Sequence, residues 1–378
     1  MPTISVCMIV KNEEKYLNQC LNSVKSFADE IIVVDTGSTD KTKDIAKEFT
    51  DKIFIFQWID DFSAARNFAL EKATKEWVFI IDADEFVNQN PKDILGQYKE
   101  NKNALAFLCM QRNYTNNIHL PGFKSLNYIK EATPNNIADQ FKGYTDRSYV
   151  KLFKRIPQLK FKYLVHEQLS GIVNTEEQII KTNYIIHHLG FDALFNKSKN
   201  EYYFKLAEKQ YLLNPDDDAL LYNAAVAYAD NNDLLKATEL LSKLYSRNKE
   251  FQNVIRMLSD FLLKLGRIHD SQELIKNHIG YLENNSAKDT SEISYLYYIL
   301  GLTYMHIHNY INAMPYFEKS NLLKENADAY NALAMIKVLN KQYLEAHSIL
   351  KKAYVLDPYN SSINTNMAKL NLIIQKNG

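Results

Sequence analysis

The chain has 378 residues, of which 46% are hydrophobic, and this is enough for two domains with separate cores. Basic and acidic residues number 45 each, so the zero net charge excludes a general electrostatic attraction to nucleic acid or anionic membranes. The cysteines Cys7, Cys20 and Cys109 form neither a disulfide framework nor a CxxC pair, which favours a reducing compartment. The sequence shows no signal-peptide pattern and no membrane-spanning run, and we expect a cytoplasmic protein.

The first ninety residues alternate short apolar runs with amphipathic segments. Strands are predicted over residues 3–10, 30–34, 53–56 and 77–81, and helices over residues 14–27, 41–49 and 62–73. This alternation predicts a doubly wound, mostly parallel sheet of the α/β class. Neither GxGxxG nor GxxxxGK[ST] occurs in the sequence, which argues against a dehydrogenase or a P-loop enzyme.

Carboxylates follow two of the predicted strands. Asp35 comes directly after the second strand, and Asp82 and Asp84 come after the fourth. Ligands bind outside the carboxyl ends of the strands in open α/β sheets. Two oxygen ligands on one face suit Mg²⁺ or Mn²⁺, although an Asp-x-Asp pair is more often a solvated turn. A metal that binds a diphosphate, next to a carboxylate that binds a base or ribose, would form a sugar-nucleotide site.

Four motifs of this region stand in the order found in family 2 glycosyltransferases of the GT-A fold. They are Ile9-Val10-Lys11-Asn12-Glu13, Val34-Asp35-Thr36-Gly37-Ser38-Thr39-Asp40-Lys41-Thr42, Asp61-Phe62-Ser63-Ala64-Ala65-Arg66-Asn67 and Asp82-Ala83-Asp84-Glu85. The N-terminal part of the chain resembles that family. The resemblance implies a Rossmann-like α/β GT-A domain that uses a UDP-sugar as donor.

The resemblance also implies roles for single residues. Asp35 would contact the uracil, Asp82 the ribose or the metal, and Asp84 would bind Mn²⁺ or Mg²⁺ directly, with Glu85 as a mere neighbour. Arg66 would lie along the donor pocket, with a surface ion pair as its alternative role. The remaining nucleotide-sugar contacts would come from Val10, Asn12, Glu13 and Ala83.

Two later motifs complete the predicted site. Val165-His166-Glu167 resembles an element of those family members that also carry helical repeats, although Tyr163-Leu164 stand where many of them have a glycine. Glu167 is the candidate general base, and its alternative role is to hold a loop by accepting backbone hydrogen bonds. His188-Leu189-Gly190-Phe191 matches a His-x-Gly-aromatic pattern of the family, which makes His188, in preference to His187, a candidate metal ligand.

The sequence between these motifs is less periodic. Residues 104–110 are predicted to form a strand. Residues 113–146 are polar and carry scattered aromatic side chains, and long segments of this kind are often functional lids. We therefore expect a loop with acceptor contacts over residues 113–146.

From residue 196 onward the sequence is helical throughout and repeats with a period near 34 residues. The small residue of each repeat, at the tight helix crossing, is Ala237, Ser271, Ala313 or Ala346. The pattern resembles tetratricopeptide repeats (TPR), which stack into an all-α solenoid with a concave face for a peptide or protein. We therefore predict a GT-A catalytic domain over residues 1–195 and a TPR domain over residues 196–378.

These features predict a metal-dependent, inverting glycosyltransferase. It would move a hexose or N-acetylhexosamine from a UDP-sugar to a Cys or Ser side chain of a peptide or protein, as its similarity to bacterial peptide S- and O-glycosyltransferases of the sublancin type implies. One alternative is a transferase that acts on a cell-envelope or flagellar glycan. Others are a phosphotransferase with Asp82 as nucleophile and a non-catalytic TPR scaffold. The repeats could also serve only to brace the catalytic domain or to form a homodimer.

Overall fold

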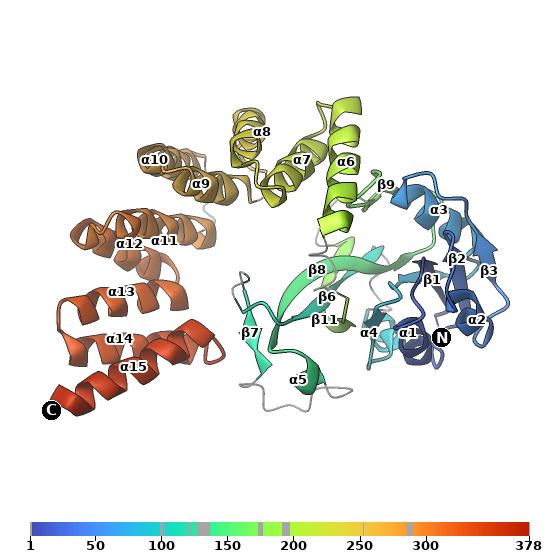
Figure 1. Cartoon of the computed structure of the whole chain (residues 1–378), viewed down its shortest axis with the longest axis horizontal. Coiled ribbons are helices and arrows are strands. Elements are labelled where there is room, and N and C mark those ends of the chain that lie inside the picture. The colour runs from blue at the N-terminus through green and yellow to red at the C-terminus, as the bar shows by residue number, and fades with distance from the viewer. Residues whose placement is uncertain are drawn as a thin grey trace. The chain divides into compact units, whose positions relative to one another are not determined.

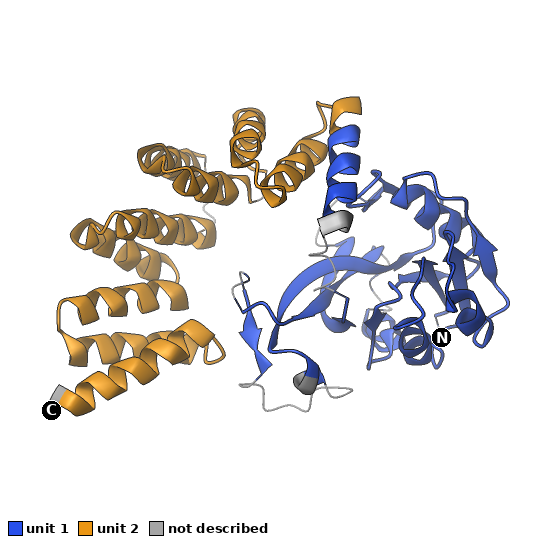
Figure 2. Ribbon diagram, viewed as in Figure 1, with its two compact units in different colours: residues 1–210 blue, residues 211–378 orange. Residues whose placement is uncertain are grey.

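The computed structural model describes residues 2–98, 101, 103–118, 120, 122–126, 137–172, 177–190, 197–251, 253–285 and 290–377. It divides into two compact units, Met1–Gln210 and Tyr211–Gly378 (Figure 2). The division falls within helix α6 (Lys197–Leu213). The domain boundary that was predicted after residue 195 lies in residues 191–196, which are outside the described residues. Each unit has hydrophobic clusters of its own.

A mixed sheet forms the centre of the first unit (Figure 1). Its strands are β1 (Ile4–Val10), β2 (Glu30–Asp35), β3 (Ile53–Ile55), β4 (Trp77–Ile80), β5 (Glu85–Phe86), β6 (Ala106–Thr115), β7 (Lys124–Ser125), β8 (Gly143–Lys154) and β11 (Ile179–His188). Their order is β3-β2-β1-β4-β8-β6-β11-β5, with β7 paired to β8. Strands β1 to β4 are parallel, β8 is antiparallel to both its neighbours, and β11 is parallel to β6 but antiparallel to β5. The predicted α/β fold is thus confirmed.

Helices cover both faces of this sheet. The helices α1 (Leu17–Val24), α2 (Thr42–Lys47) and α4 (Pro91–Gln97) contribute to one hydrophobic cluster with alternate residues of β1 and β4. Helix α3 (Phe62–Lys72) packs with the other alternate residues, and β9 (Lys160–Lys162) and β10 (Gln168–Ser170) form a hairpin on the same side. Because both faces are covered, β1, β2 and β4 are almost entirely buried, which explains their continuous apolar runs.

The segment predicted as a loop over residues 113–146 is strand at both of its ends. Asn113, Tyr114 and Thr115 extend β6, and they pair with residues 143–145 at the start of β8. The Tyr114 and Tyr144 rings are buried here with Phe86, which stabilises this extension of the sheet. Helix α5 (Ile137–Gln140) follows residues 127–136, which are outside the described residues.

The second unit is built from pairs of helices. The pairs are α7 (Asp218–Asp230) with α8 (Leu234–Arg247), α9 (Val254–Lys264) with α10 (Ile268–Asn284), α11 (Thr290–His306) with α12 (Tyr310–Leu323), and α13 (Ala327–Leu339) with α14 (Tyr343–Leu356), followed by α15 (Ser361–Asn377). The predicted small residue is always the fourth residue of the second helix, and all four are fully buried: Ala237, Ser271, Ala313 and Ala346. Five positions before each of them, the turn contains a residue with left-handed backbone: Asn232, Gly266, His308 and Lys341. The helical unit is therefore a repeat solenoid of the TPR kind, as predicted.

Candidate active site

Asp35 ends β2 at the edge of the sheet, directly beside Val10 at the end of β1. One carboxylate oxygen, Oδ1, accepts hydrogen bonds from the backbone N–H groups of Gly37 and Ser38, both at 3.0 Å. The other oxygen, Oδ2, is buried and has no hydrogen-bond partner among the described residues. A buried acceptor without a partner is costly, so Asp35 holds an oxygen that suits a donor group on a ligand.

The loop after β1 is tied to the loop after β2. The Asn12 N–H donates to Ser38 Oγ at 3.0 Å, and the Asn12 Oδ1 accepts from the Thr39 N–H at 2.8 Å. The Glu13 N–H donates to Thr42 Oγ1 at 2.7 Å. The predicted nucleotide contacts Asn12 and Glu13 therefore lie in a rigid loop next to Asp35. Val10 is buried one position before this loop begins.

Asp82 follows β4 and is held by two cations. Its Oδ1 lies 2.9 Å from Arg66 Nη2, and its Oδ2 lies 3.0 Å from Lys151 Nζ. Burial alone would raise the pKa of Asp82, but the charges on Arg66 and Lys151 hold it well below its usual range. Asp82 is therefore ionised and fixed, and the adjacent Ala83 is buried in the core. Arg66 is also buried, so its ion pairs are not surface pairs.

Glu85 and Lys151 form a buried ion pair that the sequence pattern did not predict. Lys151 Nζ lies 2.9 Å from Glu85 Oε1 and 2.8 Å from Oε2. Glu85 also accepts hydrogen bonds from the Asp82 N–H and the Gln111 side chain. Glu85 is thus part of the structure of the site rather than a mere neighbour of it. One sequence signal points to Lys151, because a single charge stands inside the apolar run from Val150 to Phe153 and must find a buried partner.

Asp84 lies beside His188, at the point where β11 ends. The His188 Nε2 is 3.3 Å from Asp84 Oδ2, and the His188 Nδ1 is 2.7 Å from Asn113 Oδ1. Gly190 passes so close that a Cβ on it would lie 1.8 Å from Asp84 Oδ2. The glycine of the His-x-Gly-aromatic pattern therefore makes room for the Asp84 carboxylate. Phe191, the aromatic residue of that pattern, lies outside the described residues.

His187 occupies a different environment from its neighbour. Its ring stacks on Phe86 with centroids 4.7 Å apart, and Tyr114 Oη lies 2.8 Å from its Nδ1. Burial and the charge on Arg112 lower the pKa of His187 to about 4, so the ring is neutral at pH 7. His187 is therefore a core residue, and His188 is the histidine that reaches the acids.

Glu167 reaches the same cluster from a loop with unusual backbone. Its Oε1 lies 2.6 Å from Arg66 Nε, so the guanidinium of Arg66 bridges Glu167 and Asp82. Tyr163 has φ of 85°, which is the left-handed conformation that glycine adopts most easily. Tyr163, at the position where the family resemblance implies a glycine, therefore has the backbone conformation of a glycine.

The loop that carries Glu167 is fixed from two sides. Ser63 Oγ donates to the carbonyl oxygen of Tyr163 at 2.6 Å, at the start of α3. The Gln210 side chain on α6 accepts a hydrogen bond from the Leu164 N–H at 2.9 Å and donates one to the Val165 carbonyl oxygen at 3.3 Å. Helix α6 therefore contributes to the framework of the site from beyond residue 195.

These strand ends belong to a known type of domain. Residues 5–155 match the family model described as Glycosyl transferase family 2. Those residues form a family 2 glycosyltransferase domain. The match includes Asp35, Arg66 and both aspartates of the Asp-x-Asp pair, whereas Glu167 and His188 lie beyond it.

Two curated proteins are similar to parts of the chain. The SPbeta prophage-derived glycosyltransferase SunS of Bacillus subtilis is 29% identical over 67% of this chain and 55% of its own length. A TPR repeat-containing protein of Synechococcus elongatus is 44% identical over 29% of this chain and 28% of its own length. The chain thus spans about half or less of the length of these relatives. Among solved structures, the thermophilic TPR protein TTC0263 of Thermus thermophilus has a TM-score of 0.37 and 18% identity, over 48% of this chain and 95% of that one.

The first unit offers two candidate ligands to a divalent metal ion. Within the described part of the chain, no group of three or more His, Cys, Asp or Glu side chains has the arrangement of a self-sufficient metal site. Asp84 and His188 alone form an oxygen and nitrogen pair that suits Mn²⁺ when a diphosphate and water supply the other ligands. The residues therefore fit a metal that binds together with its nucleotide.

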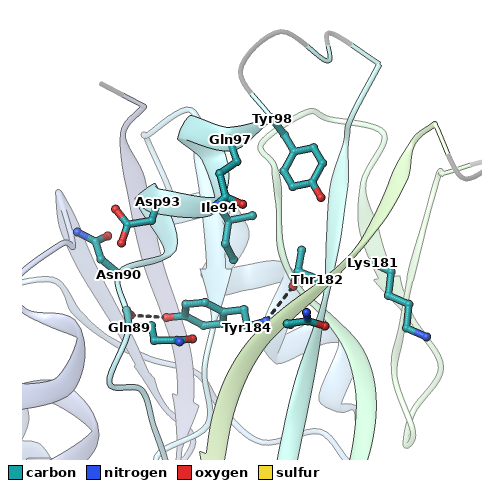
Figure 3. A pocket seen from close by; sticks show the side chains of 10 residues that line it. Gln89, Asn90, Asp93, Ile94, Gln97, Tyr98, Lys181, Thr182 and Tyr184 are labelled. Atoms are coloured by element: carbon teal, nitrogen blue, oxygen red, sulfur yellow. Dashed lines mark hydrogen bonds between the residues drawn. The ribbon is translucent and has the colours of Figure 1, made fainter.

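The first unit also has a cavity of about 490 Å³ between α4 and the middle of β11 (Figure 3). Tyr184 crosses it and donates a hydrogen bond to the Gln89 carbonyl oxygen at 2.7 Å. The predicted site residues do not line this cavity. His188 lies four residues further along β11, roughly 13 Å away at the rise of a β-strand, so the acid cluster and this cavity are separate.

No helix within the described ranges is both long and apolar enough to cross a bilayer.

Proposed function

We propose that this chain is a metal-dependent, inverting glycosyltransferase that moves a hexose or N-acetylhexosamine from a UDP-sugar to a Cys or Ser side chain of a peptide or protein. The observation that carries the proposal is the unequal pairing of the two aspartates after β4. Asp82 is bound by two cations, whereas Asp84 lies beside His188. The family 2 match over residues 5–155 supports the same activity.

The donor would bind along the ends of β1, β2 and β4. The unpartnered Oδ2 of Asp35 would accept the N–H of a uracil, and the Asn12 loop would form the wall beside it. Asp84 and His188 would hold Mn²⁺ or Mg²⁺, which when bound neutralises charge on the departing diphosphate. Arg66 and Asp82 would fix the ribose side of the pocket. The donor pocket would therefore be formed by residues from separate strand ends.

Glu167 is the proposed general base. Its Oε1 is held by Arg66, and its Oε2 makes no hydrogen bond with the described residues, so this oxygen is available to take a proton from the acceptor. We expect Glu167→Gln to lower turnover at least about 100-fold, because the amide cannot accept that proton, while UDP binding stays within about twofold. Steady-state kinetics and UDP titration measure the two effects. Near-normal turnover in a folded Glu167→Gln variant would reject the base assignment.

The acceptor is proposed to be a polypeptide because a repeat solenoid follows the catalytic unit, and such solenoids present extended surfaces to peptides and proteins. We place the protein in the cytoplasm, since its three cysteines are free, buried thiols. The alternative of a non-catalytic scaffold is less well supported, because Asp35, Asp82 and Asp84 are all retained at the strand ends.

Titration calorimetry with UDP, with and without Mn²⁺, tests the donor and metal assignments. We expect UDP to bind at least about tenfold more tightly with Mn²⁺. The full chain is then incubated with a panel of UDP-sugars and with peptides that contain Cys or Ser, and mass spectrometry identifies the transferred sugar and the modified side chain. The absence of metal-dependent UDP binding would reject the proposal as a whole. Transfer to a glycan but not to any peptide would reject the polypeptide acceptor alone.

A further inference from the structure

Lys151 stands at an irregularity in β8. Phe107 on β6 pairs with Leu152 and Leu108 pairs with Val150, so Lys151 is an extra residue with no partner in the register. Such β-bulges redirect a side chain and are common beside active sites. The Lys151 side chain is only 9% exposed although it carries a charge. The bulge therefore turns a lysine from an apolar strand into the acid cluster.

The Lys151 ammonium group donates its hydrogen bonds to two carboxylates. Its Nζ lies 3.0 Å from Asp82 Oδ2, 2.9 Å from Glu85 Oε1 and 2.8 Å from Glu85 Oε2. An ammonium has three donors, and all three are satisfied here. Removing one partner from such a buried group leaves an uncompensated charge, so this geometry is rigid.

Lys151 also decides which aspartate is available to a metal. Both oxygens of Asp82 are occupied, Oδ1 by Arg66 at 2.9 Å and Oδ2 by Lys151. A metal ion at Asp82 would bring a further cation next to Arg66 and Lys151, so like-charge repulsion disfavours Asp82 as a metal ligand. Asp84, two residues further on, contacts His188 instead. The available carboxylate is thus Asp84.

The same lysine also holds Glu85, the residue next to Asp84. Glu85, which Lys151 holds through both oxygens, is paired in register with His188 across β5 and β11. Gln111 on β6 donates to Glu85 as well, which anchors this turn to the sheet. Displacing Glu85 would therefore shift Asp84 relative to the imidazole.

We propose that Lys151 is a positioning residue that acts through Asp82 and Glu85 to keep Asp82 out of the metal's ligand set and to leave Asp84 as its acidic ligand. The inference deepens the proposed function and rests on it. Because Asp82 and Glu85 take up all three donors of Lys151, its effect would appear in the coupling between metal and nucleotide. This coupling is the factor by which Mn²⁺ tightens UDP binding.

The test compares wild type with two variants and one control. Lys151→Met combined with Glu85→Gln removes one cation and one anion, so the buried charge stays balanced. Lys151→Arg keeps the charge, but the larger planar guanidinium cannot occupy the same position between three oxygens. Lys154→Met, on the same strand, is the control, because Lys154 makes no ion pair with the described residues. Circular dichroism and thermal unfolding show which variants are folded.

Titration calorimetry with UDP, with and without Mn²⁺, then gives the coupling for each protein. We expect it to fall at least about tenfold in the double variant and at least about threefold in Lys151→Arg, and to stay at the wild-type value in Lys154→Met. UDP binding without metal should fall by a smaller factor than the coupling, because Asp82 keeps its ion pair with Arg66 on the ribose side. Wild-type coupling in either folded Lys151 variant would overturn the inference while the proposed function stands. Absence of coupling in wild type itself would reject both.

Discussion

Two carboxylates that stand only two residues apart have different surroundings at the end of β4. Asp82 is enclosed by the charges of Arg66 and Lys151, whereas Asp84 faces an imidazole. Burial lowers the pKa of His188, but the hydrogen bond and charge of Asp84 raise it above its ordinary value overall. A metal bound at Asp84 would displace any proton that the two groups share. The different surroundings of Asp82 and Asp84, on which their proposed roles rest, therefore come from neighbouring residues and not from the motif.

Gly190 gives a direct test of the Asp84 and His188 arrangement. In Gly190→Ala the new methyl group would overlap Asp84 Oδ2, which must then move away from His188. We expect metal-dependent UDP affinity to fall at least about tenfold, as measured by calorimetry. Gly96→Ala on helix α4 is the matched control, because its Cβ meets nothing within 4 Å. Unchanged affinity in a folded Gly190→Ala protein would contradict this account of the site.

Glu30 shows how a single buried carboxylate links stability to pH. It accepts hydrogen bonds from Lys52, Ser5 and Thr74, and its side chain is 3% exposed. Burial alone would raise its pKa, but these partners lower it from 4.5 to about 2. Because the folded pKa lies below the unfolded one, the stabilisation is complete above pH 4.5 and is lost as the pH falls toward 2.

We expect Glu30→Gln to reduce the free energy of unfolding by about 2 kcal/mol at pH 7, since a neutral amide replaces a charged acceptor. The difference from wild type should shrink between pH 4.5 and pH 3. Denaturant unfolding at several pH values measures it. Asp44→Asn is the control, because Asp44 is 75% exposed in its pair with Lys47 and should change stability by less than about 0.5 kcal/mol. A difference that does not depend on pH would contradict the linkage.

The turns between the paired helices repeat one backbone conformation with different residues. Gly266 has φ of 74° and Lys341 has φ of 61°, and both stand five residues before the small residue of their repeat. Glycine adopts this conformation without strain, whereas a residue with a Cβ is strained in it. The solenoid therefore carries local strain in those repeats that lack the glycine.

Adding a glycine at one of these turns and removing the glycine from the other should change stability in opposite directions. We expect Lys341→Gly to stabilise the helical unit by about 0.5 kcal/mol and Gly266→Ala to destabilise it by about 1 kcal/mol. A Cβ at residue 266 meets nothing within 4 Å, so the second effect would come from the backbone alone. Thermal unfolding of the full chain measures both. Destabilisation by Lys341→Gly would show that its long side chain contributes more than its backbone costs.

Strands that are buried on both faces, and helices whose buried residues recur at regular spacing, could be predicted from the sequence. The run from Val78 to Ile81 and the small residues of the repeats are examples, because burial imposes their composition. The β-bulge at Lys151 could not be predicted, since a register shift depends on the partner strand. The strand ends of residues 113–146 were missed because their burial comes from aromatic contacts across the sheet.

In the candidate site, too, the residues at strand ends were predictable, whereas the contacts between distant residues were not. Asp35 and Asp82 follow apolar strands in the sequence, so their place at the sheet edge was predictable. The ion pairs of Arg66 with Asp82 and Glu167 join residues 16 and 101 positions apart. Such pairing depends on tertiary structure, which the sequence pattern alone does not contain.

At the scale of the whole molecule, the chain divides into two compact units with separate hydrophobic clusters. The proposed nucleotide site lies entirely in the first unit. A ligand stabilises only the state that binds it, by about 2.7 kcal/mol at 100 times its dissociation constant. Calorimetric unfolding should therefore show two transitions, and UDP with Mn²⁺ should raise the temperature of one of them. A single transition that shifts as a whole would contradict this independence.

The pairing of β11 with β5 has a consequence for the order of folding. Asp84 and His188 meet although 104 residues separate them in the chain. Contacts between such distant residues form late, because a long loop must close first. Strands β1 to β4 can therefore assemble before Asp84 and His188 come together as the proposed metal ligands. If the site works as proposed, a growing polypeptide that has not yet added β11 lacks His188 and would not consume sugar nucleotide, so activity would begin only after the first unit is complete.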